Sequence, residues 1–126
     1  MKKKMCVLVV DDEPIMCKLA EKAMNKIGFC VLVAEDGYRA IEIVKNNPNK
    51  IDIVLLDLLM PQINGIETYK HMKDIQPSIK ALLITGTKKE RIQEEIVQEG
   101  VLPYIEKPYK IDQLTDTILR ILGEKS

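Results

Sequence analysis

The chain has 126 residues, of which 46% are hydrophobic and 30% are charged, and its formal net charge at pH 7 is zero. This length and composition predict a single domain, residues 1–126, with a substantial core. Zero net charge argues against direct nucleic-acid binding, which needs a basic surface. No apolar run is long enough to cross a membrane, and the three cysteines lack metal-ligand spacing. We therefore expect buried, reduced thiols and a cytoplasmic protein.

Apolar runs alternate with helical patterns five times along the chain, which is typical of βαβ units around a parallel sheet. The predicted elements are, in chain order, strand 6–10, helix 15–27, strand 29–34, helix 39–46, strand 51–56, helix 66–72, strand 80–85, helix 88–99, strand 102–106 and helix 111–122. Asp12 is placed to cap the first helix, and Pro14 suits its first turn. Five such units predict an α/β fold, with a doubly wound, five-stranded parallel sheet in the order 2-1-3-4-5 and five helices, as in flavodoxin-like proteins.

Carboxylates follow two strands that this order makes neighbours. Asp11 and Asp12 end the first apolar run, and Asp57 ends the third. Ligands bind beyond the carboxyl ends of the strands in open α/β sheets, so we expect the three acids to converge there. Three carboxylates repel one another unless a cation lies between them, and Mg²⁺ suits such oxygen ligands. The alternatives are an acidic rim left in solvent, or an Asp12 that only caps the helix.

Two further polar residues end the fourth and fifth strands. Lys107 could pair with Asp57 and later with an added phosphoryl oxygen, although most lysines are simply solvated. Thr85 could bond a phosphoryl oxygen through its hydroxyl, although threonine also suits an ordinary strand. Gly86 leaves room for an entering group, and Pro108 could follow a cis peptide bond, which few prolines do.

These residues together resemble the receiver domain of two-component response regulators, typified by the bacterial chemotaxis regulator. The resemblance extends from Val7 to about Leu122. It rests on VVDDEP at 9–14, LDLLMPQING at 56–65, TG at 85–86 and KP at 107–108. Each motif is weak alone, but their order and their places on the predicted elements make the set specific.

The resemblance implies a Mg²⁺-dependent phosphoacceptor. Asp57 matches the nucleophile that takes a phosphoryl group from a phosphohistidine of a sensor histidine kinase or a phosphotransfer protein. Asp12 matches the direct Mg²⁺ ligand, and Asp11 the acid that holds the ion partly through water. The backbone carbonyl of Leu59 matches a further ligand, and Lys107 the lysine that contacts the phosphoryl group.

The resemblance also implies a switch and its output. Thr85 matches the hydroxyl residue that moves toward the phosphoryl group, and Tyr104 the aromatic residue that turns inward behind it; on spacing alone, Tyr104 is equally a core aromatic. Downstream effectors would bind the surface of the fourth helix, fifth strand and fifth helix. Apart from the resemblance, the apolar stripes of the fourth and fifth helices would also suit a homodimer, although core packing explains those residues equally well. Position 86 is usually alanine in the family, so Gly86 predicts a phosphorylated state that is not unusually long-lived.

We expect a stand-alone regulator that is not an enzyme beyond its own phosphotransfer and autodephosphorylation. The alternative is a receiver from a hybrid sensor histidine kinase. A Mg²⁺-dependent phosphohydrolase with an aspartyl nucleophile would need an acid at position 59, where the chain has Leu59. A flavodoxin-like nucleotide binder would need a Gly/Ser/Thr-rich cradle after the first strand, where Asp11 and Asp12 would repel phosphates.

Overall fold

Five parallel strands form one sheet in the order β2-β1-β3-β4-β5, as the sequence predicts. The computed structural model describes residues 4–58, 60, 63, 65–86 and 103–123. Its elements are β1 (Cys6–Val10), α1 (Pro14–Lys26), β2 (Cys30–Ala34), α2 (Gly37–Asn46), β3 (Ile53–Asp57), α3 (Gly65–Ile75), β4 (Lys80–Thr85), β5 (Tyr104–Glu106) and α5 (Ile111–Ile121). The predicted helix 88–99 lies outside the described residues.

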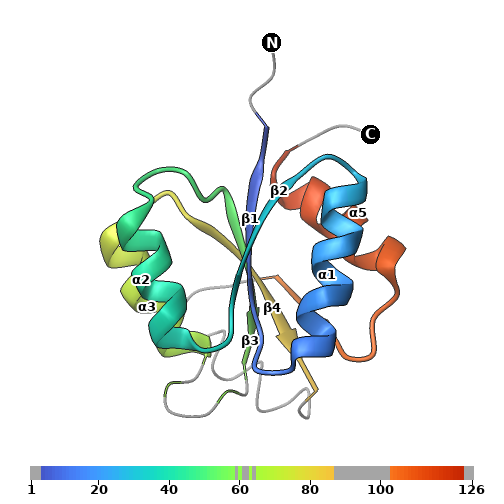
Figure 1. Cartoon of the computed structure of the whole chain (residues 1–126), viewed down its shortest axis with the longest axis horizontal. Coiled ribbons are helices and arrows are strands. Elements are labelled where there is room, and N and C mark those ends of the chain that lie inside the picture. Colours follow the sequence, from blue (N-terminus) through green and yellow to red (C-terminus); the bar gives the residue numbers. More distant parts are fainter. Residues whose placement is uncertain (1–3, 59, 61–62, 64, 87–102, 124–126) are drawn as a thin grey trace.

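Helices cover both faces of the sheet in three layers (Figure 1). The α2 and α3 helices pack on one face, around Leu8, Val54 and Met72. The α1 and α5 helices pack on the other face, around Met24, Leu82 and Ile118. Every residue of β1 and of β3 is buried, which explains why these strands are continuous apolar runs.

The helix starts differ from those predicted. The α1 helix begins at Pro14 with Glu13 at its N-cap, and no side chain caps it. The prediction that Asp12 caps this helix is therefore wrong. The side chain that accepts a hydrogen bond in this turn belongs to Asp11, whose Oδ1 lies 2.9 Å from the amide nitrogen of Glu13. The predicted helix 39–46 starts two residues earlier, at Gly37, because the Asp36 carboxylate accepts from the amide of Arg39.

The carboxyl ends of all five strands meet at one edge of the sheet, at the bottom of Figure 1. The residues directly after β1 and β5 therefore lie close to the end of β3. Within the described part of the chain, no helix is both long and apolar enough to cross a membrane.

Candidate functional site

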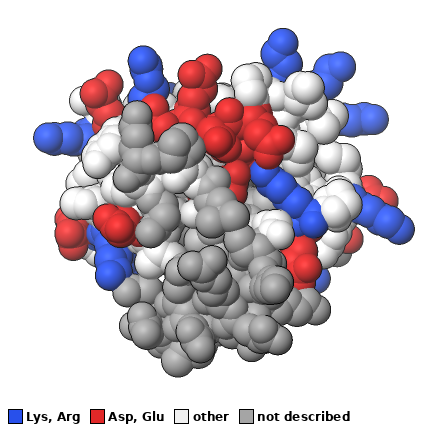
Figure 2. Space-filling model, turned by 90° about the horizontal axis from the view of Figure 1, so that it is seen from below, with Lys and Arg blue, Asp and Glu red and all other residues white. Residues whose placement is uncertain are grey.

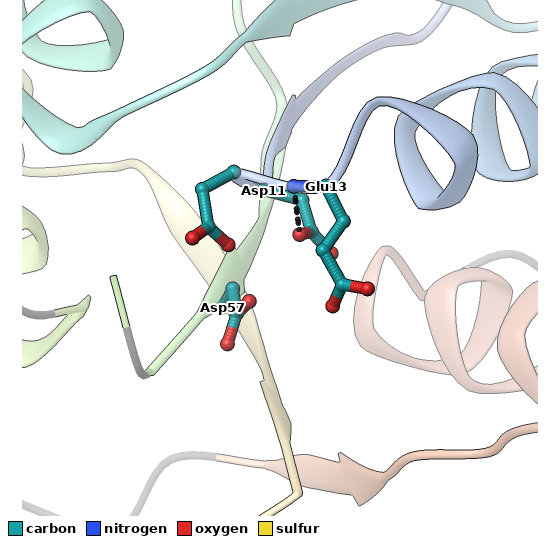
Figure 3. A group of neighbouring side chains, drawn as sticks. Asp11, Glu13 and Asp57 are labelled. Atoms are coloured by element: carbon teal, nitrogen blue, oxygen red, sulfur yellow. Dashed lines mark hydrogen bonds between the residues drawn. The ribbon is translucent and has the colours of Figure 1, made fainter. Parts of the chain in front are cut away.

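Four acidic side chains gather where β1 and β3 end side by side. Asp57 is the last residue of β3, and Asp11, Asp12 and Glu13 follow β1 directly. The two strands are paired, with Val10 opposite Leu56. One carboxylate oxygen from each acid lies within 4.8 Å of those of the other three. Figure 3 shows Asp11, Glu13 and Asp57 at this meeting of the two strand ends. The predicted convergence of the three aspartates is thus observed, and Glu13 joins them.

The four acids are unequally buried. Asp57 and Asp11 are only 5% and 6% exposed, whereas Asp12 and Glu13 are exposed. Hydrogen bonds fix both the backbone and the side chain of Asp11. Its amide donates to the carbonyl of Ala34, and its carboxylate accepts from the amide of Glu13. Burying a carboxylate is costly unless a cation or hydrogen-bond donors compensate it. A nearby positive charge would therefore stabilise both Asp11 and Asp57 in their ionised forms.

Lys107 supplies that charge. Its Nζ lies 3.1 Å from Asp11 Oδ2, 3.0 Å from Glu13 Oε1 and 3.2 Å from Asp57 Oδ2. The backbone fixes the lysine after β5, because its amide donates to the carbonyl of Thr85 at 2.6 Å. The peptide bond between Lys107 and Pro108 is cis. The expected pairing of Lys107 with Asp57 is thus present, and two further acids share the same ammonium.

The pKa of Lys107 lies above the ordinary value for a lysine. Burial alone would lower the pKa of the Lys107 ammonium, but the hydrogen bonds to Glu13 and Asp11 and the charge of Asp57 outweigh it and raise that pKa. Lys107 is therefore a permanent cation at neutral pH. Figure 2, which views this edge of the molecule directly, shows acidic side chains gathered there beside a basic one.

The donor set fits a small, hard divalent cation. Mg²⁺ prefers oxygen ligands and commonly takes one or two carboxylates while keeping several waters. Buried Asp11 and Asp57 and exposed Asp12 present oxygens within 4.8 Å of one another, and the exposed side leaves room for water. The four acids offer only oxygen ligands, which favours Mg²⁺ over softer metals.

Comparison with known proteins identifies the family. The family model described as "Response regulator receiver domain" matches residues 7–119. The chain belongs to the response regulator receiver domain family. Receiver domains are signalling modules of two-component systems rather than conventional enzymes, and aspartyl phosphorylation and Mg²⁺ binding at an acidic pocket are general features of the family.

The chain matches curated proteins over very different shares of their own length. The chain is 34% identical to Sporulation initiation phosphotransferase F of Bacillus subtilis over 95% of both proteins. It is also 34% identical to Transcriptional regulatory protein ZraR of Klebsiella oxytoca, covering 93% of this chain but 26% of that protein. A match at 26% identity covers 94% of this chain and 13% of Sensor kinase CckA of Brucella abortus.

Solved structures show the same fold. A CheY-like receiver domain protein of Methanospirillum hungatei superimposes with a TM-score of 0.88 at 21% identity, over 96% of this chain and 95% of that one. A structure of the CheX–CheY–BeF₃–Mg²⁺ complex from Borrelia burgdorferi gives a TM-score of 0.85 at 26% identity, over 93% and 88% of the two chains.

The predicted switch residues of this receiver domain lie on neighbouring strands. Thr85 is fully buried at the end of β4, and its partner across the β4–β5 pair is Glu106. Tyr104 is half-buried opposite Leu83 and packs against the core beneath α2 and α3. Leu59, whose carbonyl the resemblance assigns to the metal, lies outside the described residues. The structure brings Asp11, Asp12, Asp57 and Lys107 into one group, and Tyr104 begins β5, the strand that Lys107 follows.

Sequence analysis missed two contributors to this receiver site. Glu13 was read only as part of a motif, although its position directly after two strand-end acids was a signal for a third. Gly65 was used only as part of a motif, outside the predicted helix 66–72, yet a Cβ on it would lie 2.7 Å from the carbonyl oxygen of Asp57. The start of α3 therefore packs directly against the backbone of Asp57, which helps to fix that carboxylate.

Proposed function

We propose that this receiver domain is phosphorylated on Asp57 by a histidine kinase or a phosphotransfer protein in a Mg²⁺-dependent reaction. The observation that carries the proposal is the contact between Lys107 Nζ and Asp57 Oδ2, 3.2 Å apart inside a group of four acids. A buried nucleophilic carboxylate with a fixed ammonium and a divalent-cation site beside it is suited to phosphoryl transfer, which needs positioning and charge neutralisation.

Each side chain of the site has its own role in phosphoryl transfer. An oxygen of Asp57 attacks the phosphorus of a phosphohistidine, the new O–P bond forms as the N–P bond breaks, and the electron pair of that bond stays on the imidazole nitrogen. Asp11, Asp12, Asp57 and the backbone carbonyl of Leu59 would hold Mg²⁺, which when bound supplies positive charge to the phosphoryl oxygens. Lys107, which follows β5 at the same edge of the sheet, neutralises a further phosphoryl oxygen.

The phosphodonor would dock beside the acids on α1. Ile15 is 73% exposed and Leu19 is 48% exposed, one helical turn apart at the start of this helix. Two exposed apolar side chains next to a buried nucleophile suit a partner that presents its histidine on an apolar surface. Sites of this kind give specificity to a reaction whose chemistry is common to the whole family.

Phosphorylation would change the positions of Thr85 and Tyr104 and thereby alter the surface that includes β5 and α5. A phosphoryl group adds charge and strong acceptors, and it biases an element that has two arrangements. Thr85 at the end of β4 would bond the phosphoryl group, and Tyr104 on the adjacent strand would turn inward. Downstream effectors, or a second copy of the chain, would bind the altered surface.

We further propose a stand-alone regulator, residues 1–126, that works in the cytoplasm. The match to the Bacillus subtilis phosphotransferase over 95% of both proteins supports a receiver that functions as a single domain. The alternative, a receiver within a hybrid sensor kinase, is supported by the match to Sensor kinase CckA. A coding sequence continuous upstream of Met1 would decide for the alternative.

The proposal is tested by incubating the protein with a small phosphodonor and Mg²⁺ and measuring the intact mass. We expect one phosphoryl adduct, absent without Mg²⁺ and absent in Asp57→Asn. An adduct of the same yield in Asp57→Asn would overturn the assignment of the nucleophile.

A further inference from the structure

Lys107 is shared by three carboxylates that have different surroundings. Asp11 and Asp57 have side chains only 8% and 7% exposed, whereas the Glu13 side chain is 61% exposed. The two buried aspartates are candidate metal ligands. Glu13 lies at the solvent side of the ammonium and makes the shortest of the three contacts, at 3.0 Å.

The backbone of Glu13 is held firmly although its carboxylate is exposed. Its amide donates to Asp11 Oδ1 at 2.9 Å, and its carbonyl accepts from the amide of Cys17 in the first turn of α1. Figure 3 shows the first of these bonds as the dashed line. A carboxylate carried on a fixed backbone loses less freedom when it pairs with a cation. Glu13 is therefore well placed to hold the lysine.

We propose that Glu13 is a positioning residue that holds the Lys107 ammonium against Asp11 and Asp57, so that the chain's own lysine competes with a divalent cation for these oxygens. This inference rests on the proposed metal site. Mg²⁺ needs its oxygen ligands at roughly 2.0–2.1 Å. The ammonium already contacts Asp11 Oδ2 and Asp57 Oδ2, so the arriving ion and the ammonium repel each other.

A double-mutant cycle on metal affinity tests this coupling. Mg²⁺ dissociation constants are measured by calorimetry for the parent, Glu13→Gln, Lys107→Met and the double variant, all unphosphorylated. Removing Lys107 should tighten Mg²⁺ binding. Glu13→Gln removes a negative charge in both backgrounds, which weakens Mg²⁺ binding. When Lys107 is present, the substitution also loosens the ammonium that competes with Mg²⁺, which partly restores the affinity. We therefore expect the loss of affinity on Glu13→Gln to be roughly twofold to fivefold larger in the Lys107→Met background. An equal loss in both backgrounds overturns the proposal, because Glu13 would then act on the metal directly.

Glu35→Gln is the matched control. Glu35 is an exposed acid that follows β2 at the same edge, and it lies outside the group of four acids. Its substitution removes the same charge without removing a partner of Lys107. We expect the same small change in Mg²⁺ affinity with and without Lys107.

A second measurement needs neither metal nor phosphate. The side-chain ¹⁵N signal of Lys107 is recorded in the metal-free parent and in Glu13→Gln. We expect faster proton exchange of the ammonium in Glu13→Gln, and unchanged exchange would overturn the proposal even if Lys107→Met fails to fold. Absence of an aspartyl phosphate would instead count against the proposed function, and it would leave this reading of Glu13 intact.

Discussion

Replacing Gly65 with alanine should disturb the site through the backbone of Asp57. A Cβ at this position would lie 2.7 Å from the carbonyl oxygen of Asp57 and 2.9 Å from the Cα of Leu58. Both are main-chain atoms, so no side chain can swing aside, and the start of α3 must move away from the end of β3. Overpacking of this kind costs about 1–3 kcal/mol. For a domain of this size, that cost lowers the melting temperature by roughly 3–12 °C.

The same movement should slow phosphorylation, because it shifts the nucleophile relative to Lys107. Misplacement of reacting groups by a fraction of an ångström to one ångström costs roughly tenfold or more in rate. Thermal unfolding and the rate of adduct formation with a small phosphodonor measure the two effects. Gly86→Ala is the control for thermal stability, because a Cβ there would meet no atom of the described residues within 4 Å apart from its chain neighbours. A Gly65→Ala variant as stable and as fast as the parent would refute the reasoning.

Three further predictions concern the phosphoryl lifetime, the thiols and the donor. Gly86→Ala should lengthen the life of the aspartyl phosphate by shielding it from water, and a lifetime no longer than that of the parent would count against this. Burial raises the pKa of Cys6 and of Cys17 to about 11, above the ordinary value near 8.5, so the free energy of unfolding should fall as pH rises from about 8.5 to 11. In Cys17→Ala, the free energy of unfolding measured by urea titration should fall less over this pH range. A fall identical to that of the parent would contradict the raised pKa of Cys17. Ile15→Ser should slow transfer from the kinase and leave both stability and phosphorylation by a small donor unchanged. Equal slowing with both donors would show that Ile15 does not act by contacting the kinase.

The strand ends explain why much of the site could be predicted from sequence. β1 and β3 are buried on both faces, so they stand out as apolar runs that stop at Asp11 and Asp57. The strand order 2-1-3-4-5 that is typical of such doubly wound folds then makes these two strands neighbours. Lys107 could be added because it follows the fifth run in the same way. Periodicity and topology are thus sufficient wherever a functional residue sits within a residue or two of a buried strand.

The remaining features depend on geometry that periodicity does not fix. Beyond Val10 the chain turns, and the hydrogen bond from the Glu13 amide to Asp11 decides which carboxylate faces Lys107 and which one faces solvent. This is why Asp12 was wrongly predicted to be the helix cap. The packing of Gly65 against Asp57 joins residues on two elements, and its closeness becomes evident only when both backbones are placed.

The location of the phosphoryl group tests the account most directly. The phosphorylated parent protein is reduced with borohydride, which converts an aspartyl phosphate into homoserine, and the product is digested and sequenced by tandem mass spectrometry. We predict homoserine at position 57 alone. Homoserine at position 11 or 12, with aspartate intact at position 57, would contradict the claim that Asp57 is the nucleophile and that the other acids hold the metal.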